Sequence, residues 1–157
     1  MKQCTFIVLA SVLLATTFAF AGGPGDILGL WSTEKREARI EIYKCGPKYC
    51  GKIAWLKEST YPAGSKEGVP GTPILDHKNP DPELRNKPRL GSAILVDFVR
   101  AGDNLWKNGK IYNSNNGKIY SGKMTLISPD QLKIRGFIGI SLIGGSTTWT
   151  RTKAGSE

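Results

Sequence analysis

The chain has 157 residues and a formal net charge of +9 at pH 7, with 22 lysines and arginines against 13 aspartates and glutamates. Its basic residues are scattered and form neither an arm nor a recognition helix, which excludes the usual pattern of a nucleic-acid-binding protein. An excess of positive charge favours solubility, and it also favours attraction to anionic surfaces such as phospholipid head groups or lipopolysaccharide.

The first 21 residues have the features of a secretory signal peptide. Lys2 supplies a charged start, Phe6 to Phe20 form an apolar run, and Ala19-Phe20-Ala21 is a small-x-small cleavage site. Cys4 precedes the apolar run, whereas the acylated cysteine of a lipoprotein would follow it. We therefore expect cleavage after Ala21 and export to the periplasm or beyond the cell.

A membrane anchor is the alternative interpretation of this segment. The apolar run is too short to span a bilayer comfortably, and Gly22-Gly23-Pro24-Gly25 follows it where a positive flank would be needed. No later stretch approaches the length of a transmembrane helix, so none is expected after signal cleavage. Residues 22–157 have the usual size of one domain.

Alternating apolar residues predict three strands in the first part of this domain. These strands cover Leu28–Thr33, Ala38–Tyr43 and Gly51–Leu56. Cys45 and Cys50 lie between the second and third strands and flank the turn signal Gly-Pro. In an oxidising compartment the two cysteines are expected to form a disulfide that clips the hairpin. A disulfide that closes so short a loop stabilises the fold by only about 2 kcal/mol.

The segment Ser59–Arg89 interrupts this pattern. It contains proline at positions 62, 70, 73, 80, 82 and 88 and carries no periodic apolar run. The sequence therefore predicts a long loop between strands three and four, with one helical turn near Asp81–Arg85.

Strand signals return after this loop. The predicted strands are Gly91–Arg100, Leu105–Asn113, Lys118–Ile127, Gln131–Ile138 and Ser146–Thr152. The dipeptide Asn116-Gly117 is a strong hairpin signal because both residues tolerate positive φ. Gly91–Arg100 is apolar on both faces, which predicts a well buried strand, and Gly139–Gly145 is expected to form a glycine-rich corner.

Eight short strands without a long helix predict an all-β, antiparallel, eight-stranded barrel. Gly29 and Trp31 on the first strand and Arg151 on the last are suited to closing it, because a guanidinium can lie over an indole and hydrogen-bond the opening backbone. An eight-stranded barrel is either filled by side chains or holds one small ligand.

Polar residues that suit a functional site gather in the long loop. They are Asp76, His77, Asn79, Asp81 and Arg85. A histidine beside an aspartate can act as a general base, and an arginine can bind an anion. The alternative is structural: such residues form Asx turns, and Asp81 is a suitable helix cap. The sequence favours the structural interpretation.

The sequence offers no established catalytic or metal-binding signature. It lacks Gly-x-Ser-x-Gly and His-Glu-x-x-His, and a zinc site would need more ligands than two cysteines and His77. We therefore predict no cofactor and no metal. The four tryptophans are expected in the core, and Trp106, which follows a turn, is the one expected to be partly exposed and available to a ligand. The tryptophans are Trp31, Trp55, Trp106 and Trp149.

Several motifs together resemble one family of exported bacterial proteins, domain of unknown function 2147. The motifs are Gly29-Leu30-Trp31, Asp76–Arg85, the two Gly-Lys-Ile-Tyr stretches at 109–112 and 117–120, Arg135–Gly139, and Trp149-Thr150-Arg151. The resemblance implies a calycin-like or lipocalin-like barrel with closure roles for Gly29, Trp31 and Arg151. It implies no catalytic residues. The chain departs from a typical lipocalin in its Pro-rich loop and in lacking a clear C-terminal helix.

Three hypotheses for function follow. The first is a protein that holds a small apolar or amphipathic ligand inside the barrel. The second is an envelope interaction module whose basic surface binds an anionic glycolipid or a protein. The third, which ranks last, is an enzyme that uses the loop Asp76–Arg85.

Overall fold

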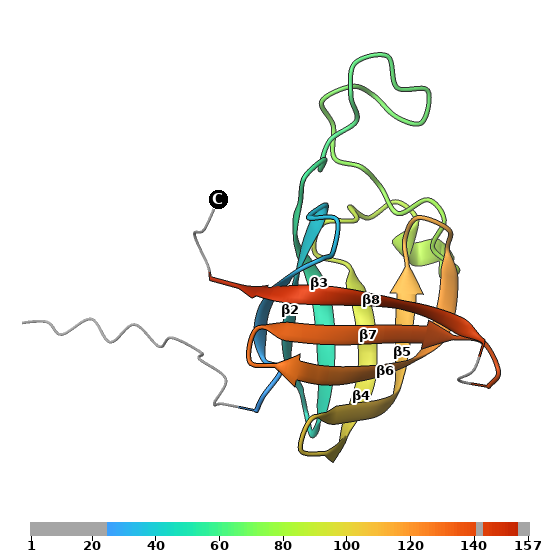
Figure 1. Ribbon diagram of the computed structural model, residues 1–157. Helices are drawn as coiled ribbons and strands as arrows, with labels where there is room; N and C mark the ends of the chain where they lie inside the picture. Colours follow the sequence, from blue (N-terminus) through green and yellow to red (C-terminus); the bar gives the residue numbers. More distant parts are fainter. Residues whose placement is uncertain (1–24, 141–142, 154–157) are drawn as a thin grey trace, which may run out of the picture.

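The computed structural model describes residues 25–140 and 143–153, so the predicted signal peptide lies outside the described residues. The strands of this described part form one closed antiparallel barrel in chain order (Figure 1). They are β1 (Gly29–Ser32), β2 (Ala38–Cys45), β3 (Lys48–Leu56), β4 (Ala93–Gly102), β5 (Leu105–Asn113), β6 (Lys118–Ser128), β7 (Gln131–Phe137) and β8 (Gly144–Thr152). The prediction of an all-β, eight-stranded barrel is confirmed.

Between β3 and β4 lies one turn of 3-10 helix, η1 (Pro82–Leu84), at the predicted position. Within the described ranges, no helix has the length and apolar character needed to cross a membrane. The predicted glycine-rich corner falls partly outside the described residues, and Gly144 and Gly145 already belong to β8.

The first and last strands meet in register, with Trp31 opposite Arg151. The guanidinium carbon of Arg151 lies 4.2 Å from the centre of the Trp31 ring. Its Nη1 donates to the carbonyl of Leu28 over 2.7 Å. Gly29 has φ +111°, and a Cβ atom there would stand 3.5 Å from the Arg151 guanidinium. A glycine therefore gives the backbone its left-handed conformation and leaves room for the arginine.

The middle of the barrel is filled by apolar side chains. Trp31, Phe98 and Trp106 have no exposed surface, and they belong to one continuous core. The other buried members are Ile27, Ile40, Ile42, Tyr49, Ile53, Leu95, Met124, Leu126, Leu132, Ile134 and Trp149. Inward-facing residues of every strand thus contribute to one core.

Four glycines form a row across neighbouring strands. Gly109 of β5 lies opposite Gly122 of β6, which lies opposite Gly136 of β7, which in turn lies opposite Gly145 of β8. A Cβ atom on Gly109 would stand 2.2 Å from the ring of Phe98, and one on Gly122 would stand 2.7 Å from it. The missing side chains therefore make room for Phe98 inside the barrel.

The prediction that β4 is buried on both faces is wrong. Leu95 and Phe98 are its buried members, and most of the other side chains on the strand are exposed. The two buried residues are three positions apart because an extra residue interrupts the alternation. Asp97 has φ +62°, and the register between β3 and β4 shifts around it, as in a β-bulge. Asn108 on β5 has the same φ and forms a second irregularity.

The long segment between β3 and β4 rises beyond one end of the barrel and returns beside the β5–β6 turn (Figure 1). Two isolated bridges connect successive parts of this segment, Thr60 with Pro73 and then Leu75 with Pro88. Lys78 Nζ donates to the carbonyl of Asn115 in the β5–β6 turn over 2.9 Å. The segment is therefore attached to the barrel.

Candidate binding sites

The loop residues singled out from the sequence divide into buried and exposed groups. Asp76 is 1% exposed and Asn79 is 6% exposed. Oδ1 of Asp76 accepts from the hydroxyl of Tyr112 on β5 over 2.7 Å, and Oδ2 accepts from Nδ2 of Asn79 over 2.8 Å. Burial and the hydrogen bond to Asp76 raise the pKa of Tyr112 well above its ordinary value. Asp76 therefore anchors the loop to the barrel wall.

The remaining loop candidates lie on the exposed side. His77 shares a hydrogen bond of 3.0 Å with the hydroxyl of Tyr61. Asp81 caps η1, since its Oδ1 accepts from the backbone N–H of Glu83. Arg85 Nε donates to the carbonyl of Asn79 over 2.8 Å.

This arrangement differs from the one that the enzyme hypothesis predicts for the loop. The enzyme hypothesis predicts His77 within hydrogen-bond reach of Asp76 or Asp81 and facing a cleft. His77 instead bonds with Tyr61, and Asp76 points away toward Tyr112. The residues engage one another and the backbone, as the structural interpretation of the sequence expects.

Two tryptophans are placed differently from the prediction. Trp106 is fully buried, because it faces inward on β5 opposite Met124 and packs edge-on against Tyr49 with ring centres 5.8 Å apart. It is therefore unavailable as an exposed ligand contact. Trp55, expected in the core, is 39% exposed on β3, and the guanidinium carbon of Arg39 lies 4.9 Å from its ring centre.

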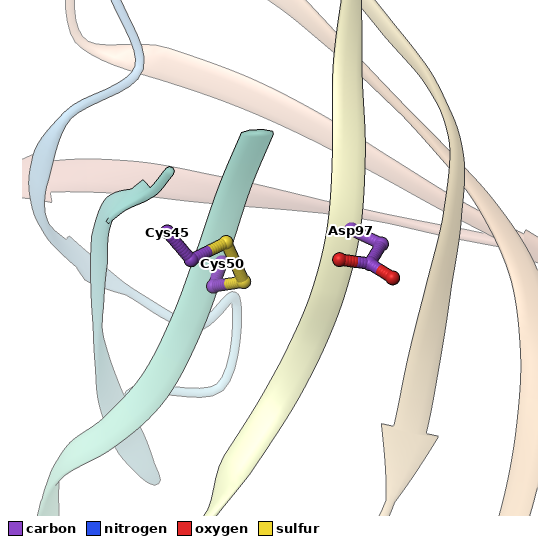
Figure 2. Close-up of side chains that lie close together, drawn as sticks. All are labelled: Cys45, Cys50 and Asp97. Atoms are coloured by element: carbon purple, nitrogen blue, oxygen red, sulfur yellow. A yellow bond between two sulfur atoms is a disulfide. The ribbon is translucent and has the colours of Figure 1, made fainter. Parts of the chain in front are cut away.

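The predicted disulfide is confirmed. Cys45 and Cys50 are bonded across the β2–β3 turn, and Asp97 of β4 lies beside them (Figure 2). These three residues are grouped closely enough to suggest a metal site. Both sulfur atoms are consumed by the disulfide, however, and the Asp97 carboxylate is paired with Lys48 Nζ at 3.3 Å. Because thiolates bind metal and disulfide sulfurs do not serve that role, the oxidised pair acts as a structural clip.

An open hollow of about 520 Å3 lies on the outer face of the barrel over β5, β6 and β7. Lys107, Lys110 and Lys123 line it together with Phe137 and other residues. Lys110 Nζ contacts the hydroxyl of Ser121, and no described carboxylate forms a salt bridge with any of the three lysines. We call this site the cationic hollow. Its size is within the usual range of about 300–1,000 Å3 for small-molecule sites.

Exposed isoleucines continue from one wall of the cationic hollow. Phe137 ends β7, and the chain beyond it carries Ile138, Ile140 and Ile143, which are 61–68% exposed. These three large aliphatic side chains follow a residue of the cationic hollow in the chain, and we refer to them as the apolar patch.

A second hollow of about 550 Å3 lies over β8, β1, β2 and β3. Arg39 and Trp55 line it, together with hydroxyl-bearing residues that include Ser32, Thr148 and Thr150. We call this site the tryptophan groove.

Neither hollow was identified from the sequence. Lys107, Lys110 and Lys123 come from two strands, and only the pairing of β5 with β6 brings them together. The nearest signal in the sequence is that these lysines lie on two strands joined by the predicted Asn-Gly hairpin. The sequence does not indicate that Trp55 is exposed, because the residues from Ile53 to Leu56 are all apolar and show no alternation.

Comparisons with known proteins agree with this fold. The chain matches the family model described as an uncharacterised protein conserved in bacteria, DUF2147, over residues 29–151. Protein HP1028 of Helicobacter pylori, a solved structure described as belonging to the lipocalin family, is similar with a TM-score of 0.66 and 24% identity. That similarity covers 82% of this chain and 84% of HP1028. No match was found among curated proteins. The chain therefore belongs to the DUF2147 family, on a closed eight-stranded barrel of lipocalin type.

Proposed function

We propose that this protein is an exported, non-catalytic binding protein for an amphiphile with an anionic head group, and that it binds this ligand at the cationic hollow. The observation that carries the proposal is a lysine-lined hollow that includes Phe137, the residue after which the exposed isoleucines follow in the chain. Lys107, Lys110 and Lys123 offer positive charge, while Phe137 and the isoleucines beyond it offer apolar surface.

The chemistry of the hollow supports this ligand class. Among the described residues no carboxylate forms a salt bridge with the three ammonium groups, which can therefore attract an anion, and the positive net charge of the chain adds a weaker long-range attraction. Full burial of an exposed isoleucine side chain is favourable by roughly 1.5–3 kcal/mol in free energy, so the apolar patch favours contact with an alkyl chain. A purely polar anion would leave that patch in water.

The packing of the interior supports a location on the outer wall. Trp31, Phe98 and Trp106 are completely buried along the barrel, where an enclosed cargo would have to lie. The export in this proposal rests on the signal-like first 21 residues and agrees with the disulfide between Cys45 and Cys50.

The test is titration of the domain with laurate, an anionic single-chain amphiphile, followed by calorimetry. A variant with Lys107→Glu, Lys110→Glu and Lys123→Glu should bind at least about tenfold more weakly, because three exposed charge contacts of about 0.5 kcal/mol each are reversed. The neutral amphiphile dodecyl maltoside should bind more weakly than laurate.

The matched control carries Lys57→Glu, Lys66→Glu and Lys87→Glu, three exposed lysines outside the cationic hollow. It changes the net charge equally and should lose much less affinity for laurate than the variant of the cationic hollow. If both variants lose the same affinity for laurate, the effect is due to net charge and not to the cationic hollow. If dodecyl maltoside binds as tightly as laurate, the lysines do not contribute to binding. Either outcome contradicts the proposal.

A further inference from the structure

The tryptophan groove has a different character from the cationic hollow and lies over other strands. Four outward-facing residues form a row in register across it. Thr150 of β8 lies opposite Ser32 of β1, Ser32 lies opposite Arg39 of β2, and Arg39 lies opposite Trp55 of β3. With strands about 4.8 Å apart, this row extends for about 14 Å. A short linear ligand can therefore contact all four side chains.

Arg39 is arranged to receive an anion. Its guanidinium is stacked 4.9 Å from the Trp55 ring centre, which orders the side chain. Within residues 25–140 and 143–153, no acceptor is hydrogen-bonded to this guanidinium and no carboxylate forms a salt bridge with it. A planar guanidinium held by an aromatic ring, with its N–H donors free, matches the two oxygens of a carboxylate.

The other groups of the groove suit a polyhydroxylated ligand. Thr148 and Thr150 present side chains on β8, and their hydroxyls have no hydrogen-bond partner among the described residues. Hydroxyls can both donate and accept, so they can pair with the hydroxyls of a sugar. Trp55, 39% exposed, offers part of an indole face as an apolar platform.

The charges in the groove favour an acidic ligand over a neutral one. Arg36 and Arg39 line it, and Glu34 is the carboxylate among its lining residues. Glu34 accepts a hydrogen bond from Thr147 over 3.0 Å. Arg151 also lines the groove, but its donors are directed to backbone carbonyls such as that of Pro129.

We propose that the tryptophan groove binds an acidic oligosaccharide, with a uronate carboxylate on Arg39, a sugar ring against the exposed part of Trp55, and sugar hydroxyls on Thr148 and Thr150. This site is independent of the cationic hollow and of the amphiphile proposed there.

The test uses the indole N–H signals of the four tryptophans in nitrogen-15 NMR. Trp31, Trp106 and Trp149 are at most 5% exposed, so Trp55 is the tryptophan that a surface ligand reaches. Trigalacturonic acid should shift the Trp55 signal saturably, and Trp55→Phe identifies that signal. Arg39→Gln should weaken binding about tenfold to a hundredfold, as expected for a lost charge-assisted hydrogen-bonding pair. Arg39→Lys should also weaken it, because an ammonium lacks the planar fork.

Controls separate the contributions of sugar and charge. Lys87→Gln removes one exposed positive charge elsewhere and should leave the affinity unchanged. Thr150→Val tests the hydroxyls without changing charge and should weaken binding severalfold; its thermal unfolding, like that of Arg39→Gln, should match the parent protein. The proposal is overturned by an absent Trp55 response, by an equal response to neutral maltotriose, by an equal response to acetate alone, or by unchanged affinity in a folded Arg39→Gln variant.

Discussion

At the scale of single residues, the same polar side chain can serve structure or chemistry, and its partners decide which. Asp76 is a typical candidate for acid–base chemistry by sequence, yet each of its two carboxylate oxygens accepts a hydrogen bond from a neighbouring side chain. A buried carboxylate is tolerated because these donors replace water. Its partner Tyr112 is 8% exposed, so the pair joins the loop to the barrel in a protected position.

The Asp76–Tyr112 contact predicts a specific pH dependence. Because the pKa of Tyr112 is raised on folding, this tyrosine contributes stability that is fully present below its unfolded pKa of about 10 and is lost as pH rises above that value. Tyr112→Phe should lower the free energy of unfolding by about 1–3 kcal/mol at neutral pH, since a buried acceptor loses its donor. The variant should lack the part of the alkaline decline that Tyr112 causes.

Urea unfolding at a series of pH values measures both effects. Tyr120→Phe is the control, because its hydroxyl accepts a bond from Asn116 at an exposed position. A decline above pH 10 that is identical in the parent protein and in Tyr112→Phe would contradict this account.

At the scale of strands, irregularities determine which side chains face inward. The row of glycines from β5 to β8 removes side chains from the inner wall, and Phe98 occupies the space beside two of them. The bulge at Asp97 turns Phe98 inward and breaks the alternation. The bulge and the glycines thus act together, because one directs a large ring inward and the others accommodate it.

Gly109→Ala should therefore destabilise the barrel by about 1–3 kcal/mol, the usual cost of overpacking a core. Its Cβ atom would stand 2.2 Å from the Phe98 ring. Gly145→Ala, in the same row, is the matched control, because no described atom lies within 4 Å of its added Cβ. It should be neutral or stabilise by about 0.4–1 kcal/mol through a more restricted unfolded chain. Chemical denaturation of the two variants measures this difference, and equal destabilisation would show that Phe98 packing is not the cause.

At the scale of the whole molecule, closure of the barrel depends on contacts between the two ends of the described chain. Arg151 donates to the carbonyls of Asp26, Leu28 and Pro129, each over 2.7 Å, and stacks on Trp31. Partial burial lowers the pKa of Arg151 from its ordinary value by desolvation. The side chain of Arg151 in β8 thus connects this strand to the segment before β1 and to the segment before β7.

Arg151→Gln should lower the free energy of unfolding by about 2–5 kcal/mol, because several charge-assisted bonds and a cation–π contact are lost together. Arg151→Lys should be intermediate, because it keeps the charge but cannot reach three carbonyls. Thermal unfolding measures both, with Lys66→Gln as an exposed control that should change stability by less than about 0.5 kcal/mol. Wild-type stability in Arg151→Gln would show that closure does not depend on this residue.

Much of the architecture is readable from local pattern, for a physical reason. Strand alternation, turn residues and short cysteine spacing are properties of neighbouring residues, so the eight strands, the Asn-Gly hairpin and the Cys45–Cys50 bridge follow from the chain alone. The loop candidates were also located as a group, although their individual partners were not.

The two proposed binding sites are decided by tertiary structure. Lys107 and Lys123 share a hollow because β5 and β6 pair in one register, and Arg39 meets Trp55 because β2 and β3 pair in another. Whether Trp106 faces the core and Trp55 faces water depends on register and bulges, which shift inward and outward faces by one residue. These choices depend on pairing energies between distant segments, which local sequence patterns do not contain.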